Sequence, residues 1–197
     1  MRPKSTQAPK TRELLLEEAI RTIRAAGVHA CTLNGVVRRI GKTHGGFYGH
    51  FSSRDAMVDA AVERMIESNR SRRVERAAAE DSPAQALMTF IDHYLSPEHR
   101  DDSIAGCVLP LLASEALRMP DGARQHYAAE AKSVREFIAV PLRARGGQQV
   151  DATATSLLAE MVGALCQARA EPDPLESGQI LAASLTVVRQ RSGLPFR

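Results

Sequence analysis

The sequence predicts an all-α protein, and three observations lead to that prediction. Ala, Leu and Arg are abundant, while aromatic residues make up only 4% of the chain and Trp is absent, a composition that favours helix over sheet. Apolar residues recur at helical spacing, and Gly and Pro separate the segments in which they do so. The stretch "VHACTL" at 28–33 is the one strand candidate, and its Thr32 is better suited to capping a helix.

Composition narrows the class of protein. The chain has 197 residues, 44% of them hydrophobic and 25% charged, as in ordinary soluble domains. Cys31, Cys107 and Cys166 are far apart and show no metal-binding spacing, so we expect reduced thiols in a cytoplasmic protein without metal or cofactor. The basic N-terminus lacks the apolar region of a secretory signal. No apolar run is long enough to span a membrane.

Residues 11–56 are expected to form a compact unit of three short helices. A flexible basic arm at 1–10 precedes the first helix, which Gly27 ends. Thr32 caps a second helix that is only two turns long and stops at Gly41. Short helices joined by such a tight turn are typical of a helix-turn-helix unit.

The remainder, residues 57–197, is expected to be helical throughout. Ser53 begins a long helix that continues to about Ala79. Its arginines at 70, 72, 73 and 76 alternate with Glu, so we expect a solvated face with an Arg76–Glu80 pair. The later helices are predicted at 83–96, at 103–118 with an interruption at Pro110, and at 121–144, 152–170 and 175–191.

Charge is distributed unevenly along the chain. Residues 1–54 hold ten Lys and Arg against three Glu, a net charge of +7, which leaves −4 for the rest of a chain whose total is +3. A basic N-terminal unit joined to a mildly acidic body indicates a polyanionic partner for the first part only.

The stretch "KTHGGFYGHF" at 42–51 contains three glycines between helical segments. Each glycine inside a helix costs roughly 0.8–1 kcal/mol relative to alanine. A function that requires glycine at these positions would explain this loss of helix stability. A phosphate-binding loop requires a glycine at the position of Val36. A metal site is disfavoured because His44 and His50, six residues apart, fall on different faces of a helix.

A DNA recognition helix explains this composition better. A helix that enters the major groove brings its backbone close to the DNA, and Gly45 and Gly46 remove bulk there. Phe47 and Phe51, four residues apart, are expected to anchor the helix to the others. The predicted DNA-contacting residues are Thr32, Arg38, Lys42, Thr43, His44, Gly45, Gly46, Tyr48, His50 and Arg54.

These residues also resemble a known family. The segment from "TRELLLEEAI" to "AAVERM", about 55 residues, is similar to the DNA-binding segment of TetR/AcrR-type transcriptional regulators. The similarity lies in the glycine turn, the run "THGG", the Phe-Tyr and His-Phe pairs and the start "SRD" of the next helix. His44 and Gly46 depart from the commonest residues at their positions, which are Lys or Arg and Thr. The run "THGGFY" is a recurrent variant of the pattern.

The resemblance implies an all-α fold of about nine helices. An N-terminal three-helix helix-turn-helix domain would be followed by a larger C-terminal helical ligand-binding and dimerisation domain. The implied function is a ligand-responsive DNA-binding regulator, a repressor released from palindromic operator DNA by a small-molecule inducer. The last two helices would pair with those of a second copy in a homodimer. Their apolar stripes supply the predicted interface residues Leu158, Met161, Leu165, Leu181, Leu185 and Val188, which otherwise form intramolecular core.

The C-terminal domain also contains candidate sensor residues. Aromatic, Met and His residues at helical spacing form core or line a pocket. The predicted pocket residues are Phe90, His93, Tyr94, Cys107, Met119, His126, Tyr127, Phe137 and Met161. Two alternatives remain open: Cys107 as an electrophile- or redox-sensing thiol, and a small helical enzyme with His93 or His126 as its base, although no catalytic constellation is evident.

Overall fold

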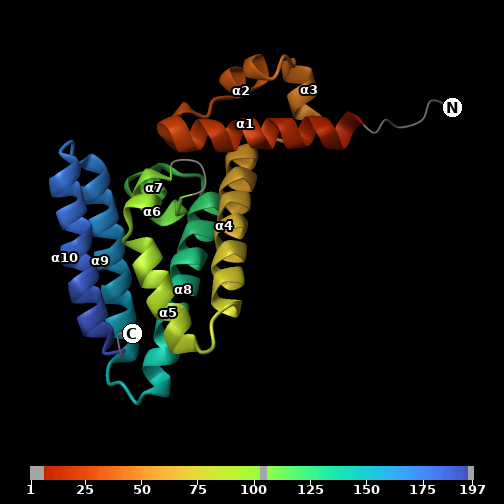
Figure 1. The fold of residues 1–197 in the computed structure, drawn as a ribbon. Helices are drawn as coiled ribbons and strands as arrows, with labels where there is room; N and C mark the ends of the chain where they lie inside the picture. The colour runs from red at the N-terminus through yellow and green to blue at the C-terminus, as the bar shows by residue number, and fades with distance from the viewer. Residues whose placement is uncertain (1–6, 103–105, 195–197) are drawn as a thin grey trace. The chain divides into compact units, whose positions relative to one another are not determined.

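The structure, a computed structural model, describes residues 7–102 and 106–194, and all the regular secondary structure in these residues is helical (Figure 1). This confirms the all-α prediction, and no helix in these residues is long and apolar enough to cross a bilayer. The helices are α1 (Gln7–Ala30), α2 (Leu33–Arg39), α3 (His44–Tyr48), α4 (Arg54–Ala78), α5 (Pro83–Tyr94), α6 (Pro97–Asp101), α7 (Val108–Leu112), the 3₁₀ helix η1 (Ala113–Arg118), α8 (Asp121–Ala144), α9 (Val150–Ala170) and α10 (Pro174–Ser192).

The chain forms two compact units whose boundaries differ from the predicted domains 11–56 and 57–197. Unit 1 comprises Met1–Glu67 and Leu111–Tyr127, and unit 2 comprises Ser68–Pro110 and Ala128–Arg197. No Gly or Pro interrupts α4, so nothing ends the first unit near residue 56, and the helix contributes residues to both units. The segment from Leu111 to Tyr127 joins the first unit although it is distant in sequence.

In unit 1, α2 and α3 lie on the same side of α1 (Figure 1) and begin at threonine caps. The Thr32 hydroxyl accepts a hydrogen bond from the Gly35 N–H at 3.1 Å, and that of Thr43 accepts one from the Gly46 N–H at 3.3 Å. Such caps satisfy amides that have no partner in the first turn of a helix. Gly41 adopts a φ of 64° in the turn between α2 and α3, a conformation that glycine adopts without steric cost.

The first helix differs from its prediction at both ends. It begins at Gln7, so residues 7–10 are helical and do not belong to a flexible arm, while residues 1–6 lie outside the described residues. Gly27, with φ 81° and ψ 171°, kinks the helix, which then continues to Ala30. A carboxylate oxygen of Glu115 accepts a hydrogen bond from the Val28 N–H at 2.8 Å. This side chain replaces a helical partner lost at the kink.

The five-residue helix α3 is fixed by its aromatic residues. Phe47 is fully buried and Phe51 is 5% exposed, and their ring centroids lie 5.8 Å apart. A single helical turn cannot persist without packing, so the burial of Phe47 keeps α3 in place. This confirms the predicted anchoring role of the two phenylalanines.

In unit 2, α9 and α10 lie side by side along most of their length (Figure 1). This pairing corrects most of the predicted dimer interface. Five of the six residues are buried within the single chain, and Leu185 is half-buried, because the apolar stripes form intramolecular core. The five buried residues are Leu158, Met161, Leu165, Leu181 and Val188.

Replacement of the anchor tests this account of α3. We expect Phe47→Ala to lower the free energy of unfolding of unit 1 by about 3–5 kcal/mol, because a large buried side chain is lost. The neighbouring Tyr48 is 60% exposed, and Tyr48→Ala should cost at most about 1.5 kcal/mol. Urea denaturation followed by circular dichroism measures both, and equal losses would show that Phe47 is not the anchor.

Candidate nucleic-acid interface and candidate effector pocket

The turn before α3 and the first residues of that helix form an exposed surface of unit 1. Lys42, Thr43, His44 and Gly45 are exposed and Gly46 is half-buried. A Cβ atom added to Gly45 would meet nothing closer than the Thr43 hydroxyl at 4.0 Å. The fold itself therefore does not require glycine at position 45.

Arg38 and Arg54, both predicted to contact DNA, differ in the contacts that their side chains make within unit 1. Arg38 is exposed, and its guanidinium makes no hydrogen bond or ion pair within the described residues. Arg54 instead donates hydrogen bonds to the carbonyls of Cys31 and Val28, at 2.9 and 2.5 Å, and pairs with Asp55 at 3.0 Å. Arg54 therefore holds the chain between α1 and α2, a role that the sequence did not indicate, and its contact with DNA remains a prediction.

The remaining predicted residues of this surface are all at least partly accessible. Thr32 and Tyr48 are exposed, and His50 is half-buried. Together with Arg38, Lys42 and the start of α3 they form a surface with two cationic side chains and little bulk at its centre. Such a surface suits a backbone rich in phosphate.

Unit 2 contains a cavity of about 70 Å³ lined by residues of α4, α5 and α8 and by His99, Asp102 and Cys107. Five of the predicted pocket residues line it: Phe90, His93, Tyr94, Cys107 and Phe137. The sequence did not single out the other lining residues as pocket residues, and these are Asn69, Arg72, Arg73, Arg76, Ala77, Ala86, His99, Asp102, Glu130 and Val134. Whether a ligand binds here remains a prediction.

Four predicted pocket residues do not line this cavity. Met119, His126 and Tyr127 belong to unit 1, where the Nε2 atom of His126 lies 3.3 Å from a carboxylate oxygen of Asp59. Met161 is fully buried in unit 2. Helical spacing of Met and aromatic residues did not distinguish core from cavity at these positions.

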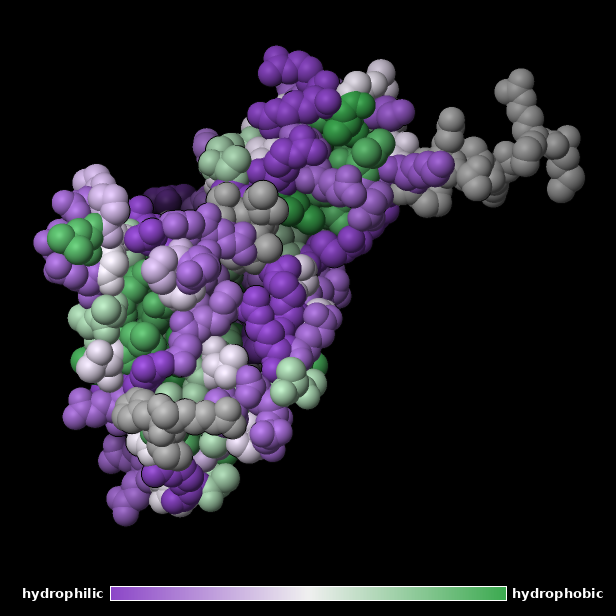
Figure 2. All heavy atoms as spheres, in the orientation of Figure 1, coloured by the Kyte–Doolittle hydropathy of each residue, from purple (hydrophilic) through white to green (hydrophobic). Residues whose placement is uncertain are grey.

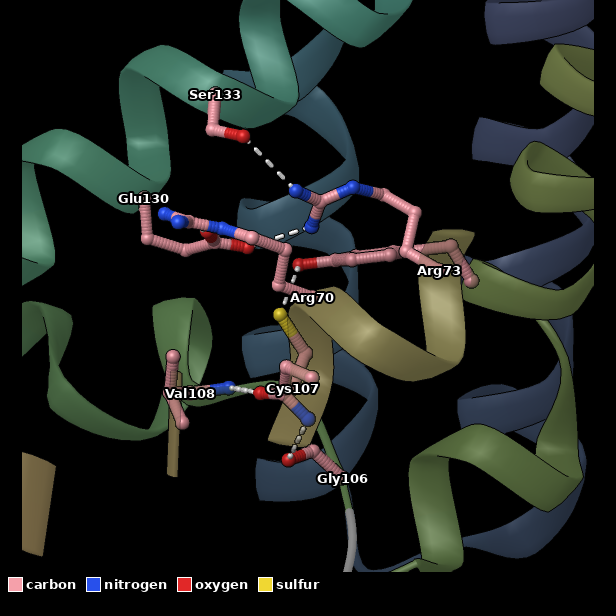
Figure 3. Close-up of polar contacts among 9 residues, drawn as sticks. Arg70, Arg73, Gly106, Cys107, Val108, Glu130 and Ser133 are labelled. Carbon is pink, nitrogen blue, oxygen red and sulfur yellow. Dashed lines mark hydrogen bonds and ion pairs between the residues drawn. The ribbon is translucent and has the colours of Figure 1, made fainter. Parts of the chain in front are cut away.

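A buried carboxylate organises the arginines of α4 (Figure 3). Glu130 on α8 is 1% exposed and pairs with Arg73 at 2.5 Å and with Arg70 at 3.3 Å. Arg73 also donates to the Ser133 hydroxyl at 3.0 Å. The prediction of a solvated arginine face is therefore wrong for Arg73, whose side chain is only 9% exposed.

The predicted Arg76–Glu80 pair is also absent from the described residues. Glu80 instead accepts a hydrogen bond from the Thr89 hydroxyl at 2.8 Å. Arg76 is exposed and also lines the cavity. Its guanidinium makes no hydrogen bond or ion pair with the residues that the structure describes.

Hydrogen bonds on both sides hold the backbone around Cys107. The Val108 N–H donates to Asn69 Oδ1 at 2.9 Å, and the Asn69 amide donates to the Gly106 carbonyl at 3.5 Å. The Cys107 N–H donates to His99 Nε2 at 3.2 Å. Since that nitrogen accepts, His99 carries its proton on Nδ1, which donates to the Tyr94 carbonyl at 2.8 Å.

The titratable groups of the cavity disfavour both alternative functions. Burial, reinforced by the charge of Arg76, lowers the pKa of His93 to about 4, so His93 is a weak base at neutral pH. Burial raises the pKa of the Cys107 thiol, whose sulfur accepts a hydrogen bond from the Tyr94 hydroxyl at 3.6 Å. A raised pKa reduces the thiolate that reacts with electrophiles.

Comparison with known proteins agrees with this architecture. Residues 15–61 match the family model described as "Bacterial regulatory proteins, tetR family". The reduced form of Escherichia coli NemR is 21% identical, with a TM-score of 0.77 over 92% of this chain and 96% of that one. A TetR-family regulator from Cytophaga hutchinsonii is 18% identical, with a TM-score of 0.78 over 98% and 99%. One from Chloroflexus aurantiacus is 22% identical, with a TM-score of 0.77 over 94% and 96%.

The helix-turn-helix segment and the fold of the whole chain agree with each other. Residues 15–61 match the DNA-binding segment of the tetR family, and nearly the whole chain shares the fold of solved TetR-family transcriptional regulators. Regulators of this family bind operator DNA and act as dimers.

Alkylation of the cysteines tests the thiol chemistry. At pH 7 we expect iodoacetamide to label Cys107 in the folded protein more slowly than in the urea-unfolded chain, because burial raises its pKa and limits its thiolate fraction. The labelling rate should continue to rise above pH 9, where an ordinary thiol is already mostly ionised. Peptide mapping with Cys107→Ser as a control identifies the site, and rapid labelling at pH 7 would support a sensor thiol.

Proposed function

We propose that this chain is a homodimeric, ligand-responsive regulator that represses transcription. It binds a palindromic operator through the surface around α3 and releases it when a small-molecule inducer occupies the unit 2 cavity. The single observation that carries the proposal is the exposure of Gly45 on a helix whose Phe47 is buried. The backbone of α3 is therefore uncovered at the surface, although no packing within the chain requires glycine at position 45.

The local chemistry of α3 supports docking in a major groove. The N-terminal residues of a recognition helix reach base edges and phosphates, and in α3 these positions are occupied by His44 and Gly45 after the cap Thr43. Arg38 and Lys42 supply positive charge for phosphates. Tyr48, 60% exposed, offers a hydroxyl for another phosphate oxygen.

The outer faces of α9 and α10 support assembly into a dimer. Residues 161–168 and 177–188 contain no charged side chain. The exposed residues among them are Gln167, Gln179, Ala182, Ala183, Thr186 and Val187. Figure 2 shows pale and green residues among purple ones along these two helices. Exposed apolar and small residues include Ala159 on α9, and Leu175, Ala182, Ala183 and Val187 on α10. A helical surface of this kind is suited to a twofold interface.

Dimerisation gives the inducer a way to act on DNA. Two recognition helices bind successive half-sites only when they are about 34–36 Å apart, or a multiple of that distance. An inducer that binds better to a dimer with another spacing shifts the population away from the DNA-binding form. A coupling free energy of about 1–3 kcal/mol between the two sites is typical of such regulation.

The exposure of Gly45 generates a direct test of DNA binding. We expect Gly45→Leu to keep or slightly raise the stability of the protein, because leucine favours helix over glycine and has room here. Operator affinity should fall at least about tenfold, or about 1.4 kcal/mol, because the side chain separates α3 from the groove. A gel shift with the DNA upstream of the protein's own gene, at two salt concentrations, measures this loss.

The control for this test is Ala78→Leu, which adds the same side chain at an exposed position near the end of α4. Its operator affinity should equal that of the unchanged protein. Full DNA binding by Gly45→Leu would remove the steric argument. Binding that does not weaken with salt would argue against phosphate contacts.

The dimer interface is tested by placing a charge on α10. We expect Ala183→Glu to raise the dimer dissociation constant at least about a hundredfold, because a charge buried without a partner costs several kcal/mol. Sedimentation velocity measures the change, and Ala78→Glu on α4 is the matched control. A dimer that tolerates Ala183→Glu as well as the control would place the interface elsewhere.

A further inference from the structure

The cavity of unit 2 contains more cationic than anionic side chains. Three arginines of α4 line it, against the carboxylates of Asp102 and Glu130. The buried Glu130 is already bound to Arg73 and Arg70, so it offers little charge to a ligand. Apart from the Glu130 pair, the charged residues that line the cavity are Arg72, Arg76 and Asp102.

We infer that the effector taken up by this cavity is a small organic acid, whose carboxylate binds at Arg76 and Arg72 and whose apolar part packs on Phe90 and Phe137. The inference rests on the proposed function, because it names the chemical class of the inducer. Guanidinium groups match a carboxylate in charge and in the geometry of their donors.

Arg76 is the first residue that carries this inference. The residue is exposed, its guanidinium makes no hydrogen bond or ion pair within the described residues, and it lies on the same face of α4 as Asn69, Arg72 and Arg73, three to seven residues earlier. Arg72 donates to the Ser68 hydroxyl at 2.7 Å, which steadies its guanidinium. A carboxylate at this place receives charged hydrogen bonds without displacing the Glu130 pair.

His93 adds a neutral polar group on the opposite wall. Its ring makes no hydrogen bond with the residues that the structure describes, and its centroid lies 5.2 Å from that of His99. The charge of Arg76 is one of the causes that keep His93 unprotonated. The same field opposes a cationic ligand, while it favours an anionic one that accepts a hydrogen bond from the imidazole.

The rest of the wall is apolar and the space is small. Phe90 and Phe137 meet edge to face with centroids 5.3 Å apart, beside Ala86 and Val134. The cavity volume of about 70 Å³ is room for about five water-sized groups. We therefore expect an acid about the size of benzoate, with part of the molecule at the open side.

Three probes with the same ring separate charge from shape. Isothermal titration calorimetry of the full-length protein, without DNA, should show benzoate binding more tightly than benzamide, and benzylamine binding least. Arg76→Gln should weaken benzoate at least about tenfold, or about 1.4 kcal/mol, and leave benzamide nearly unchanged. Arg143→Gln removes the same charge from an exposed site of unit 2 outside the cavity and should bind benzoate as the unchanged protein does.

The outcomes that overturn the inference are distinct from those that overturn the proposed function. Equal or tighter binding of benzamide or benzylamine, an Arg76→Gln variant that keeps its benzoate affinity, or no saturable benzoate binding in the millimolar range would overturn it. Circular dichroism of Arg76→Gln excludes misfolding as the cause of a loss. Because calorimetry requires no operator, failure of the gel shift affects the regulator proposal and leaves the ligand class standing.

Discussion

The burial of Phe47 is the contact on which the surface around α3, the proposed DNA-binding surface, depends. Helix α3 has five residues, two of them glycine, and a helix this short has no stability of its own in water. Its cap at Thr43 satisfies one amide, while the Phe47 side chain supplies the apolar burial. Helix geometry is thus maintained from inside, and the outer face is free to carry almost no side-chain bulk.

A second buried contact performs a comparable task in unit 2. Glu130 is inaccessible to solvent and binds two arginines of α4, which joins α4 to α8 along one wall of the cavity. A buried carboxylate is tolerated only when it is fully paired. Because Glu130 pairs with Arg73 and Arg70, it does not pair with Arg76, whose guanidinium makes no ion pair within the described residues and lines the cavity.

Local signals in the sequence predicted much of the fold. Thr32 caps the second helix as predicted, because a cap acts on its immediate neighbours, and the 121–144 helix has the predicted limits. The short helix α6 was not predicted, since its five residues are too few to show a periodicity. The basic cluster was misassigned because the partner of Arg73 is 57 residues away in sequence.

The candidate sites were predictable to different degrees for the same physical reason. Most residues around α3 are close together in sequence, so the pattern of one short stretch indicates the surface. The structural contacts of Arg54 were not predictable, because its acceptors are backbone carbonyls 23 and 26 residues earlier. The cavity combines side chains from four segments. Periodicity identifies apolar and aromatic residues on a helix, but it does not tell which of them face a neighbouring helix and which face a void.

The apolar stripes of α9 and α10 were predicted to face a second copy of the chain, but it is the other faces of these helices that support a dimer. Their apolar stripes are used inside the chain, as the burial of Met161 and Val188 shows. A surface helix with one buried stripe normally carries charged residues on its other face. Between Ala152 and Ala168 the only charged residue is Glu160, and it is paired with Arg191. A face in contact with water normally carries charged residues, whereas a face that packs closely against a second copy needs small, uncharged ones. The argument for a dimer therefore rests on the exposed faces of these two helices.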